Sequence, residues 1–274
     1  MMKSYIKNNV GWLYDLLKEI YKYTPMWKKI KSERKENKLK REEEEAEIIK
    51  IIFDNQYIVQ NGLFKGMKYI KRSSGSALLP KILGSYEEPI QGWIKEVIED
   101  KKYEDILDIG CAEGYYACGF AMSMPNAKIT AYDIDEVARK NSTQLKELNE
   151  LRNIEIKAEC THEELNTKSQ PNTLVFCDIE GFEKILLDPI KVPNLKYVDM
   201  LIESHDCFVP NITEELIERF YLTHTMRIIV DYPFRVNKYN TLKAASKEQM
   251  EYITNEKRSP FMKFIYMESI NENI

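Results

Sequence analysis

Short apolar runs alternate with amphipathic segments through the second half of the chain. Seven of them have the length and composition of β-strands: 104–109, 127–132, 154–158, 173–177, 197–203, 226–232 and 261–267. Most of the segments between them are long enough for a helix that crosses over a sheet. This alternation predicts an α/β protein with a mostly parallel sheet.

The last two runs differ from the others because a polar loop, without a clear helical pattern, separates them. Strands that follow each other in this way can pair directly. We therefore expect an antiparallel pair at one edge of the sheet. The predicted fold class is α/β, a Rossmann-like doubly wound sheet of seven strands that is mostly parallel, with the last strand antiparallel.

The N-terminal part of the chain favours helix. Residues 5–23 carry apolar side chains at helical spacing, and Pro25 ends that helix or begins the next one. A second helix is predicted over residues 26–54, where a basic block precedes an acidic block. These charges are typical of a solvated helix with ion pairs four residues apart, and contact with an anionic partner is the less favoured alternative.

Three segments follow from these patterns. Residues 1–60 are predicted to form a helical N-terminal extension, residues 61–100 a connecting segment that ends in a helix around 87–100, and residues 101–274 the α/β domain. The apolar stripe of an amphipathic helix needs a partner to cover it. We therefore expect the N-terminal helices to form either a lid or a homodimer contact.

Composition and charge narrow the function classes. Of the 274 residues, 43% are hydrophobic and 31% are charged, which is typical of a soluble globular protein. The 40 basic and 44 acidic residues give a net charge of -4, so we expect no nucleic-acid partner. We find no run long enough for a membrane span and no convincing signal peptide. Five cysteines without metal-ligand spacing fit reduced thiols, and we expect a cytoplasmic location.

The clearest chemical feature is a glycine loop at the end of the first predicted strand. The strand runs into Asp108, and Gly110 and Gly114 follow before a predicted helix. Small residues allow a sharp turn at a strand end and a close approach to a ligand. The amide groups at the start of the helix can face a carboxylate or a phosphate. This pattern predicts a binding site for a nucleotide-like cofactor.

An acidic residue after the second predicted strand supports this interpretation. Asp133 ends that strand, and a carboxylate at this place suits the two hydroxyls of a ribose. The loop lacks the G-x-G-x-x-G spacing of a dinucleotide site, and Glu113 is a poor neighbour for a pyrophosphate. An adenosyl cofactor is therefore favoured, and a nucleotide-dependent oxidoreductase is kept as an alternative.

The motifs resemble those of a known enzyme family. The pattern D-x-G-x-x-x-G is similar to motif I of class I S-adenosylmethionine-dependent methyltransferases. The sequences LDIGCAEGYYACGFA, AYDID and LVFCDIEGFEKILLDP, in this order, resemble the FkbM-type branch of that superfamily. The resemblance covers roughly residues 84–205. It implies a methyltransferase, and the residues before it depart from the minimal fold, so the substrate of relatives does not transfer simply.

The resemblance implies roles for individual residues. Asp108, Gly110 and Gly114 are expected to hold the methionine moiety of S-adenosylmethionine. Asp133 is expected to bind the ribose hydroxyls, with Ile134 against the adenine. The expected cofactor site is completed by Glu159 near the adenine amino group, Glu87 as a positioning group, and Cys111, Ala112, Tyr115 and Asp178.

A second group of polar residues follows the fourth and fifth predicted strands. Asp178, Glu180, Glu203, His205 and Asp206 lie where strand ends line the ligand crevice of a parallel sheet. We expect His205, Asp178 and Glu180 to be catalytic, with His205 as the general base that removes a proton from a hydroxyl. Mg²⁺ bound by Asp178, Glu203 and Asp206 is an alternative, and helix capping by Glu180 and Asp206 is another.

The expected function is O-methylation of a hydroxyl on a small molecule or glycan with S-adenosylmethionine as methyl donor. Nitrogen or carbon acceptors stay open, because substrate contacts lie in loops that follow no general code. A catalytically silent module that keeps the fold and recruits a partner is the alternative from another class. His162, His224 and the cysteines are expected to have surface or packing roles.

Overall fold

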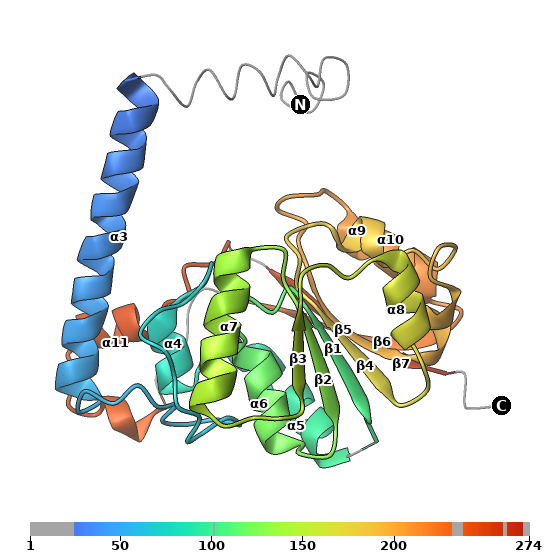
Figure 1. Cartoon of the computed structure of the whole chain (residues 1–274), viewed down its shortest axis with the longest axis horizontal. Coiled ribbons are helices and arrows are strands. Elements are labelled where there is room, and N and C mark those ends of the chain that lie inside the picture. Colours follow the sequence, from blue (N-terminus) through green and yellow to red (C-terminus); the bar gives the residue numbers. More distant parts are fainter. Residues whose placement is uncertain (1–24, 101, 232–237, 260–261, 271–274) are drawn as a thin grey trace. The chain divides into compact units, whose positions relative to one another are not determined.

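A seven-stranded mixed sheet is the centre of the fold (Figure 1). The computed structural model describes residues 25–100, 102–231, 238–259 and 262–270. The strand order is β3-β2-β1-β4-β5-β7-β6. The strands are β1 (Asp105–Ile109), β2 (Lys128–Tyr132), β3 (Ile154–Lys157), β4 (Thr173–Cys177), β5 (Asp199–Ser204), β6 (His224–Val230) and β7 (Lys263–Ser269).

The pairing of the strands confirms the predicted fold class. The pairs β1–β2, β1–β4, β2–β3 and β4–β5 are parallel. β7 runs antiparallel to both β5 and β6, so β6 and β7 form the expected antiparallel pair at the edge. Because β1 lies between β2 and β4, the chain changes direction across the sheet at β1, and this is where an open α/β sheet binds ligands.

Alternation within the strands divides the core into two layers. In β1, Leu107 and Ile109 face one side and belong to a large buried cluster, together with residues of the other central strands. Ile106 and Asp108 have the opposite parity and face the other side. On that side, the ring of Phe176 in β4 packs against Tyr116 at a centroid distance of 4.4 Å. The strands are therefore buried on both faces, which explains their nearly continuous apolar runs.

Helices cover both faces of the sheet. Figure 1 shows α6 and α7 on one side of it and α8, α9 and α10 on the other. Side chains of α8, α9 and α10 belong to the same buried cluster as Leu107 and Ile109. The helices after β1 are α6 (Tyr115–Ser123), α7 (Glu136–Leu148), α8 (His162–Lys168), α9 (Glu183–Leu186), α10 (Ile212–Phe220) and α11 (Lys247–Thr254), with 3₁₀ turns η2 (Pro193–Tyr197) and η3 (Asn240–Leu242).

The segment before the sheet contains two helices and little strand. An isolated bridge joins Ile58 to Lys68. It is followed by α4 (Leu78–Leu83), the 3₁₀ turn η1 (Glu88–Ile90) and α5 (Gln91–Asp100). The helix predicted around residues 87–100 is thus confirmed. All six residues of α4 are buried, including the charged Lys81.

The N-terminal helix α3 (Pro25–Ile52) confirms the predicted helix at 26–54. The chain divides into two units, residues 1–48 and 49–274, and most of α3 belongs to the first. Lys29–Glu33, Lys38–Glu42 and Arg41–Glu45 are ion pairs four residues apart, at 3.9, 3.7 and 3.8 Å. The helix expected over residues 5–23 lies outside the described residues. No described helix is both long enough and apolar enough to span a membrane.

Candidate active site

The glycine loop, residues 110–114, turns sharply after β1. The N–H groups of Gly110 and Cys111 both donate to the carbonyl oxygen of Tyr132, at 2.8 and 2.9 Å. Gly110 has a φ of +90°, and a Cβ at this position would lie 1.8 Å from the carbonyl oxygen of Asp178. Because no side chain fits there, a glycine is required for β1 and β4 to end side by side.

Asp108 brings a carboxylate with a free oxygen to this loop. Its side chain is buried, with 2% exposure, and its Oδ2 has no hydrogen-bond partner among the described residues. Burial raises the pKa of Asp108 to about 7. A buried polar atom without a partner is costly. The position therefore fits a donor group that a ligand supplies.

Asp133 lies beside the loop, as the sequence predicted. Its Oδ2 accepts a hydrogen bond from the N–H of Ala112 at 2.9 Å, and its Oδ1 accepts one from the N–H of Asp135 at 2.8 Å. The next residue, Ile134, is 85% exposed. An oriented carboxylate can bind the ribose hydroxyls of a nucleoside, and the exposed apolar side chain next to it can pack against the flat face of the base.

Glu113 is buried against the segment that precedes the sheet. Its carboxylate accepts hydrogen bonds from Lys81 Nζ at 2.5 Å, Tyr69 Oη at 2.7 Å, and Ser73 Oγ and Ser74 N at 2.8 Å. Although burial alone would raise the pKa of Glu113, Lys81 and the other donors lower it. The charge of Glu113 is paired within the protein, so Glu113 does not by itself disfavour a pyrophosphate at this loop.

His205 occupies the centre of the polar group at the ends of β4 and β5. Its Nδ1 lies 2.9 Å from Glu183 Oε1, and its Nε2 lies 3.4 Å from Asp178 Oδ1 and 3.8 Å from Glu180 Oε2. Glu183 also accepts the N–H of Ile179 at 2.9 Å. The three residues predicted to be catalytic therefore do come together, and Glu183 fixes the orientation of the imidazole.

The pKa values of this group differ from the expectation for a histidine base. Burial would lower the pKa of His205, but the hydrogen bond with Glu183 and the charge of Asp178 raise it to about 9. Desolvation raises the pKa of Asp178 to about 7, although His205 opposes this. An imidazole that is already protonated at neutral pH cannot accept a proton. These surroundings disagree with the predicted role of His205 as the general base.

Arg258 joins this group from the insertion between β6 and β7. Its guanidinium contacts Glu87, Glu203 Oε1 at 2.5 Å and Glu256 Oε2 at 2.8 Å. It also donates to Tyr86 Oη at 2.9 Å. Neither Arg258 nor Lys81 was identified from the sequence, because each is a single basic residue outside any motif.

In the predicted set of metal ligands, the structure has His205 in place of Asp206. Ligand atoms of Asp178, Glu203 and His205 lie within 4.8 Å of one another. Asp206 is not in this group, because its Oδ2 binds Thr213 Oγ1 at 2.6 Å and Lys263 Nζ at 2.8 Å. Its Oδ1 accepts the N–H of Thr213 in the first turn of α10, at 3.2 Å. Asp206 thus serves the start of that helix, as the capping alternative expected.

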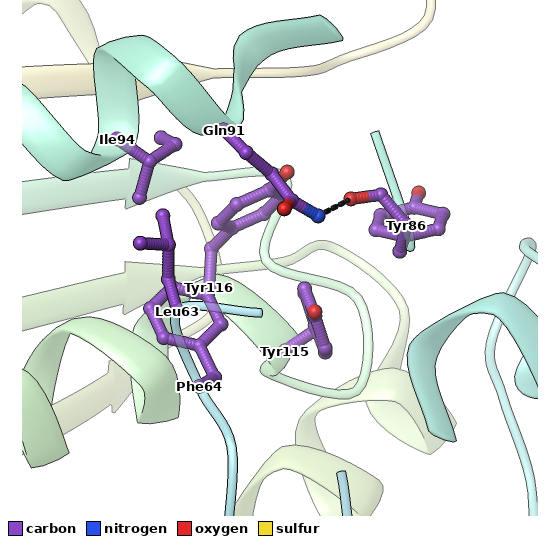
Figure 2. A pocket seen from close by; sticks show the side chains of 7 residues that line it. All are labelled: Leu63, Phe64, Tyr86, Gln91, Ile94, Tyr115 and Tyr116. Carbon is purple, nitrogen blue, oxygen red and sulfur yellow. Dashed lines mark hydrogen bonds between the residues drawn. The ribbon is translucent and has the colours of Figure 1, made fainter. Parts of the chain in front are cut away.

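The remaining predicted cofactor residues have varied surroundings. Glu87 is buried and accepts the hydroxyl of Tyr116 at 2.6 Å. Cys111 and Tyr115 are also buried, whereas Glu159 is exposed. Figure 2 shows Tyr115 and Tyr116 in the wall of a small cavity. Its other lining residues are Leu63, Phe64, Tyr86, Gln91 and Ile94.

The other two histidines have the surface and packing roles that the sequence indicated. His224 is buried, and its Nε2 lies 2.9 Å from the carbonyl oxygen of Val198. His162 is the first residue of α8, and its Nε2 lies 2.8 Å from the carbonyl oxygen of Ile185. Both side chains therefore contact backbone groups and lie outside the His205 group.

Comparisons with known proteins place this chain in a family. A family model described as "Methyltransferase domain" matches residues 100–272. The O-methyltransferase TomG from Streptomyces achromogenes, involved in tomaymycin synthesis and solved in complex with SAM, is 11% identical, covers 69% of this chain and 82% of its own, and has a TM-score of 0.45. A structure of WbdD is 17% identical, covers 67% of this chain and 40% of its own, and has a TM-score of 0.45. No curated protein matches the sequence.

Proposed function

The chain belongs to the methyltransferase domain family, and from this premise we propose that it is an S-adenosylmethionine-dependent O-methyltransferase of the FkbM type. The observation that carries the proposal is the glycine loop with Asp133 bonded to it at the switch point of the sheet. The D-x-E-G-x-E sequence from Asp178 to Glu183 supports the FkbM assignment.

The residues at the loop fit this cofactor. Asp108, with its unpaired buried oxygen, would bind the ammonium group of the methionine moiety. Asp133 would bind the ribose hydroxyls, and Ile134 would cover the adenine. Glu159 would contact the adenine amino group from its exposed position. When bound, the cofactor supplies a methyl group on a positively charged sulfur.

The polar group at β4 and β5 would act on the acceptor. Asp178 would accept the proton of the acceptor hydroxyl, because its pKa of about 7 balances the ionised fraction against basicity. His205, held by Glu183 and charged at neutral pH, would stabilise the ionised carboxylate of Asp178. The side chain of Glu180 is 72% exposed, and it would accept a hydrogen bond from a neighbouring hydroxyl of the acceptor.

The acceptor class follows from the same groups. Carboxylate oxygens at the ends of β4 and β5 accept hydrogen bonds, so they suit a neutral acceptor rich in hydroxyls and repel an anionic one. We therefore propose a small molecule or a glycan as acceptor. A homodimer contact through the N-terminal helices stays a prediction that sedimentation of the full chain against residues 61–274 would test.

Calorimetric titration with S-adenosylhomocysteine tests the cofactor assignment. The full chain is expected to bind it, and a folded sample that does not bind would refute the proposal. Titration with NAD⁺ and NADP⁺ tests the oxidoreductase alternative, which requires binding of a dinucleotide instead. Binding of S-adenosylhomocysteine without turnover of any hydroxylated acceptor would favour the silent module.

A further inference from the structure

A buried ion pair joins the glycine loop to the segment that precedes the sheet. Lys81 lies on α4 and is 2% exposed, and Glu113 lies in the loop and is fully buried. Their charged atoms are 2.5 Å apart, and 32 residues separate them in the sequence. Because the family match begins at residue 100, Lys81 comes from outside the matched domain.

The loop next to this pair has an unfavourable backbone conformation. Ala112 has a φ of +48°, in the left-handed region that a residue with a Cβ rarely adopts. Such a conformation costs free energy and persists only where the surroundings hold it. Its N–H is the group that donates to Asp133. On the other side of Ala112, four donors hold the carboxylate of Glu113.

Lys81 can hold the loop because its own charge is fixed. Its Nζ also donates to Ser76 Oγ at 2.6 Å, and it lies 4.5 Å from the ring centroid of Tyr86. The ring of Tyr115 lies 5.6 Å away. A buried ammonium with these partners has little freedom to move, and an unpaired Glu113 would be strongly disfavoured at this depth.

We propose that Lys81 is a positioning residue that sets the conformation of the glycine loop through Glu113. The pair holds residues 110–114 from the side opposite the cofactor, so that the N–H of Ala112 stays directed at Asp133. The effect on cofactor affinity rests on the proposed function, whereas the effect on the loop itself does not.

The chain contains its own reporter for the loop. Cys111 is a buried free thiol within it, and Cys118 is a buried free thiol in α6, four residues after Gly114. Cys207 is an exposed free thiol. Buried thiols react only when the structure opens locally or globally. Alkylation by iodoacetamide, followed for each cysteine by mass spectrometry, therefore separates loop opening from general unfolding, with Cys207 as the labelling control.

Three variants test the proposal: Lys81→Met, Glu113→Gln and the double variant. Lys81→Met leaves an unpaired buried charge, so it is expected to destabilise the fold as well. The double variant removes both charges and is expected to regain most of the lost stability. In the double variant we expect Cys111 to react about tenfold faster than in the wild type, with Cys118 within about twofold.

Lys102→Met is the matched control, because Lys102 pairs with Asp199 at 2.8 Å at the opposite end of β5. It should leave Cys111 alkylation unchanged. The proposal is overturned if the folded double variant alkylates Cys111 at the wild-type rate, or if Cys111 and Cys118 accelerate together.

Affinity for S-adenosylhomocysteine gives a second readout. The double variant is expected to bind S-adenosylhomocysteine about tenfold more weakly at nearly wild-type melting temperature. The reason is that a displaced loop moves the Ala112 N–H, which orients the carboxylate of Asp133. Wild-type affinity in a variant with faster Cys111 alkylation would overturn the link to the cofactor. A wild-type chain that does not bind S-adenosylhomocysteine would refute the proposed function instead and leave the alkylation result standing.

Discussion

The two ends of the candidate site bury charge in different ways. At the glycine loop, one lysine meets one glutamate, and Lys81 and the other donors satisfy the carboxylate of Glu113. At the ends of β4 and β5, Arg258 and His205 contact a larger set of carboxylates: Glu87, Asp178, Glu180, Glu183, Glu203 and Glu256. Among the residues that the structure describes, the first arrangement is balanced and the second is not.

The imbalance appears in the pKa values. At the balanced end, the pKa of Glu113 is lowered and the group stays ionised. At the other end, desolvation raises the pKa of Asp178 to about 7 and that of Glu203 well above its usual range. Groups that titrate near neutral pH can exchange protons with a substrate. We therefore assign the proposed support of the loop to the balanced pair and the proposed chemistry to the unbalanced group.

Replacement of Asp178 tests the unbalanced end most severely. Asp178→Asn keeps the size of the side chain and removes the base, so we expect turnover to fall about 10³-fold. Affinity for S-adenosylhomocysteine and the melting temperature should change little. A variant with near wild-type turnover would show that the acceptor proton leaves by another route.

Removal of Arg258 tests how much the excess of carboxylates lowers the free energy of unfolding. Arg258→Met removes the cation that contacts Glu87, Glu203 and Glu256, and we expect a loss of about 3–5 kcal/mol in the free energy of unfolding. Denaturant titration measures it. The control Lys102→Met breaks a partly exposed pair and should cost below about 1 kcal/mol. Equal effects of the two variants would contradict the distinction between a buried pair and a pair with one exposed partner.

Asp133→Ala tests the cofactor side of the site. The variant removes two charge-assisted hydrogen bonds within the loop region and the proposed ribose ligand. We expect S-adenosylhomocysteine to bind about 10- to 100-fold more weakly, as measured by calorimetry. Unchanged affinity would place the ribose elsewhere.

The pH dependence of kcat sharpens the roles of Asp178 and His205. Activity should rise as the pH passes through about 7, because Asp178 must lose its proton to act as a base. It should fall above about 9, where His205 loses its charge. In His205→Gln the alkaline limb should disappear. The acidic limb should shift to higher pH, because the pKa of Asp178 rises when the neighbouring cation is missing. A wild-type profile that is flat from pH 6 to 8 would contradict the assignment of the base.

The smallest effect is expected from chelation. Arg258 already donates to Glu203, and His205 faces Asp178, so the oxygens of this set are engaged by cations of the protein itself. We expect EDTA to change the methylation rate by less than about twofold. A strong loss of activity that Mg²⁺ restores would revive the metal alternative, with ligands from Asp178, Glu203 and His205.

Local patterns predicted most of the fold and the first half of the site. The strand runs predicted the central sheet because alternation and length are properties of a short window. Asp108, Gly110 and Asp133 were predicted because strand ends of a parallel sheet meet at one edge. The same rule for strand ends predicted that Asp178, Glu180 and His205 lie together, and they do. It misplaced Asp206, since the pattern does not say whether an acid after a strand faces the crevice or the next helix.

Short stretches of sequence were enough to predict the order of the elements, the glycine loop and the acids that follow the strands, because each depends on neighbours within a few residues. The pairing of the charges could not be predicted in this way, because it depends on the tertiary structure. Arg258 meets Glu87 across 171 residues and Lys81 meets Glu113 across 32. A buried charge is costly unless an opposite charge lies next to it, and packing brings such charges together from distant parts of the sequence. The same pairing protonates His205 and leaves Asp178 poised near neutral pH.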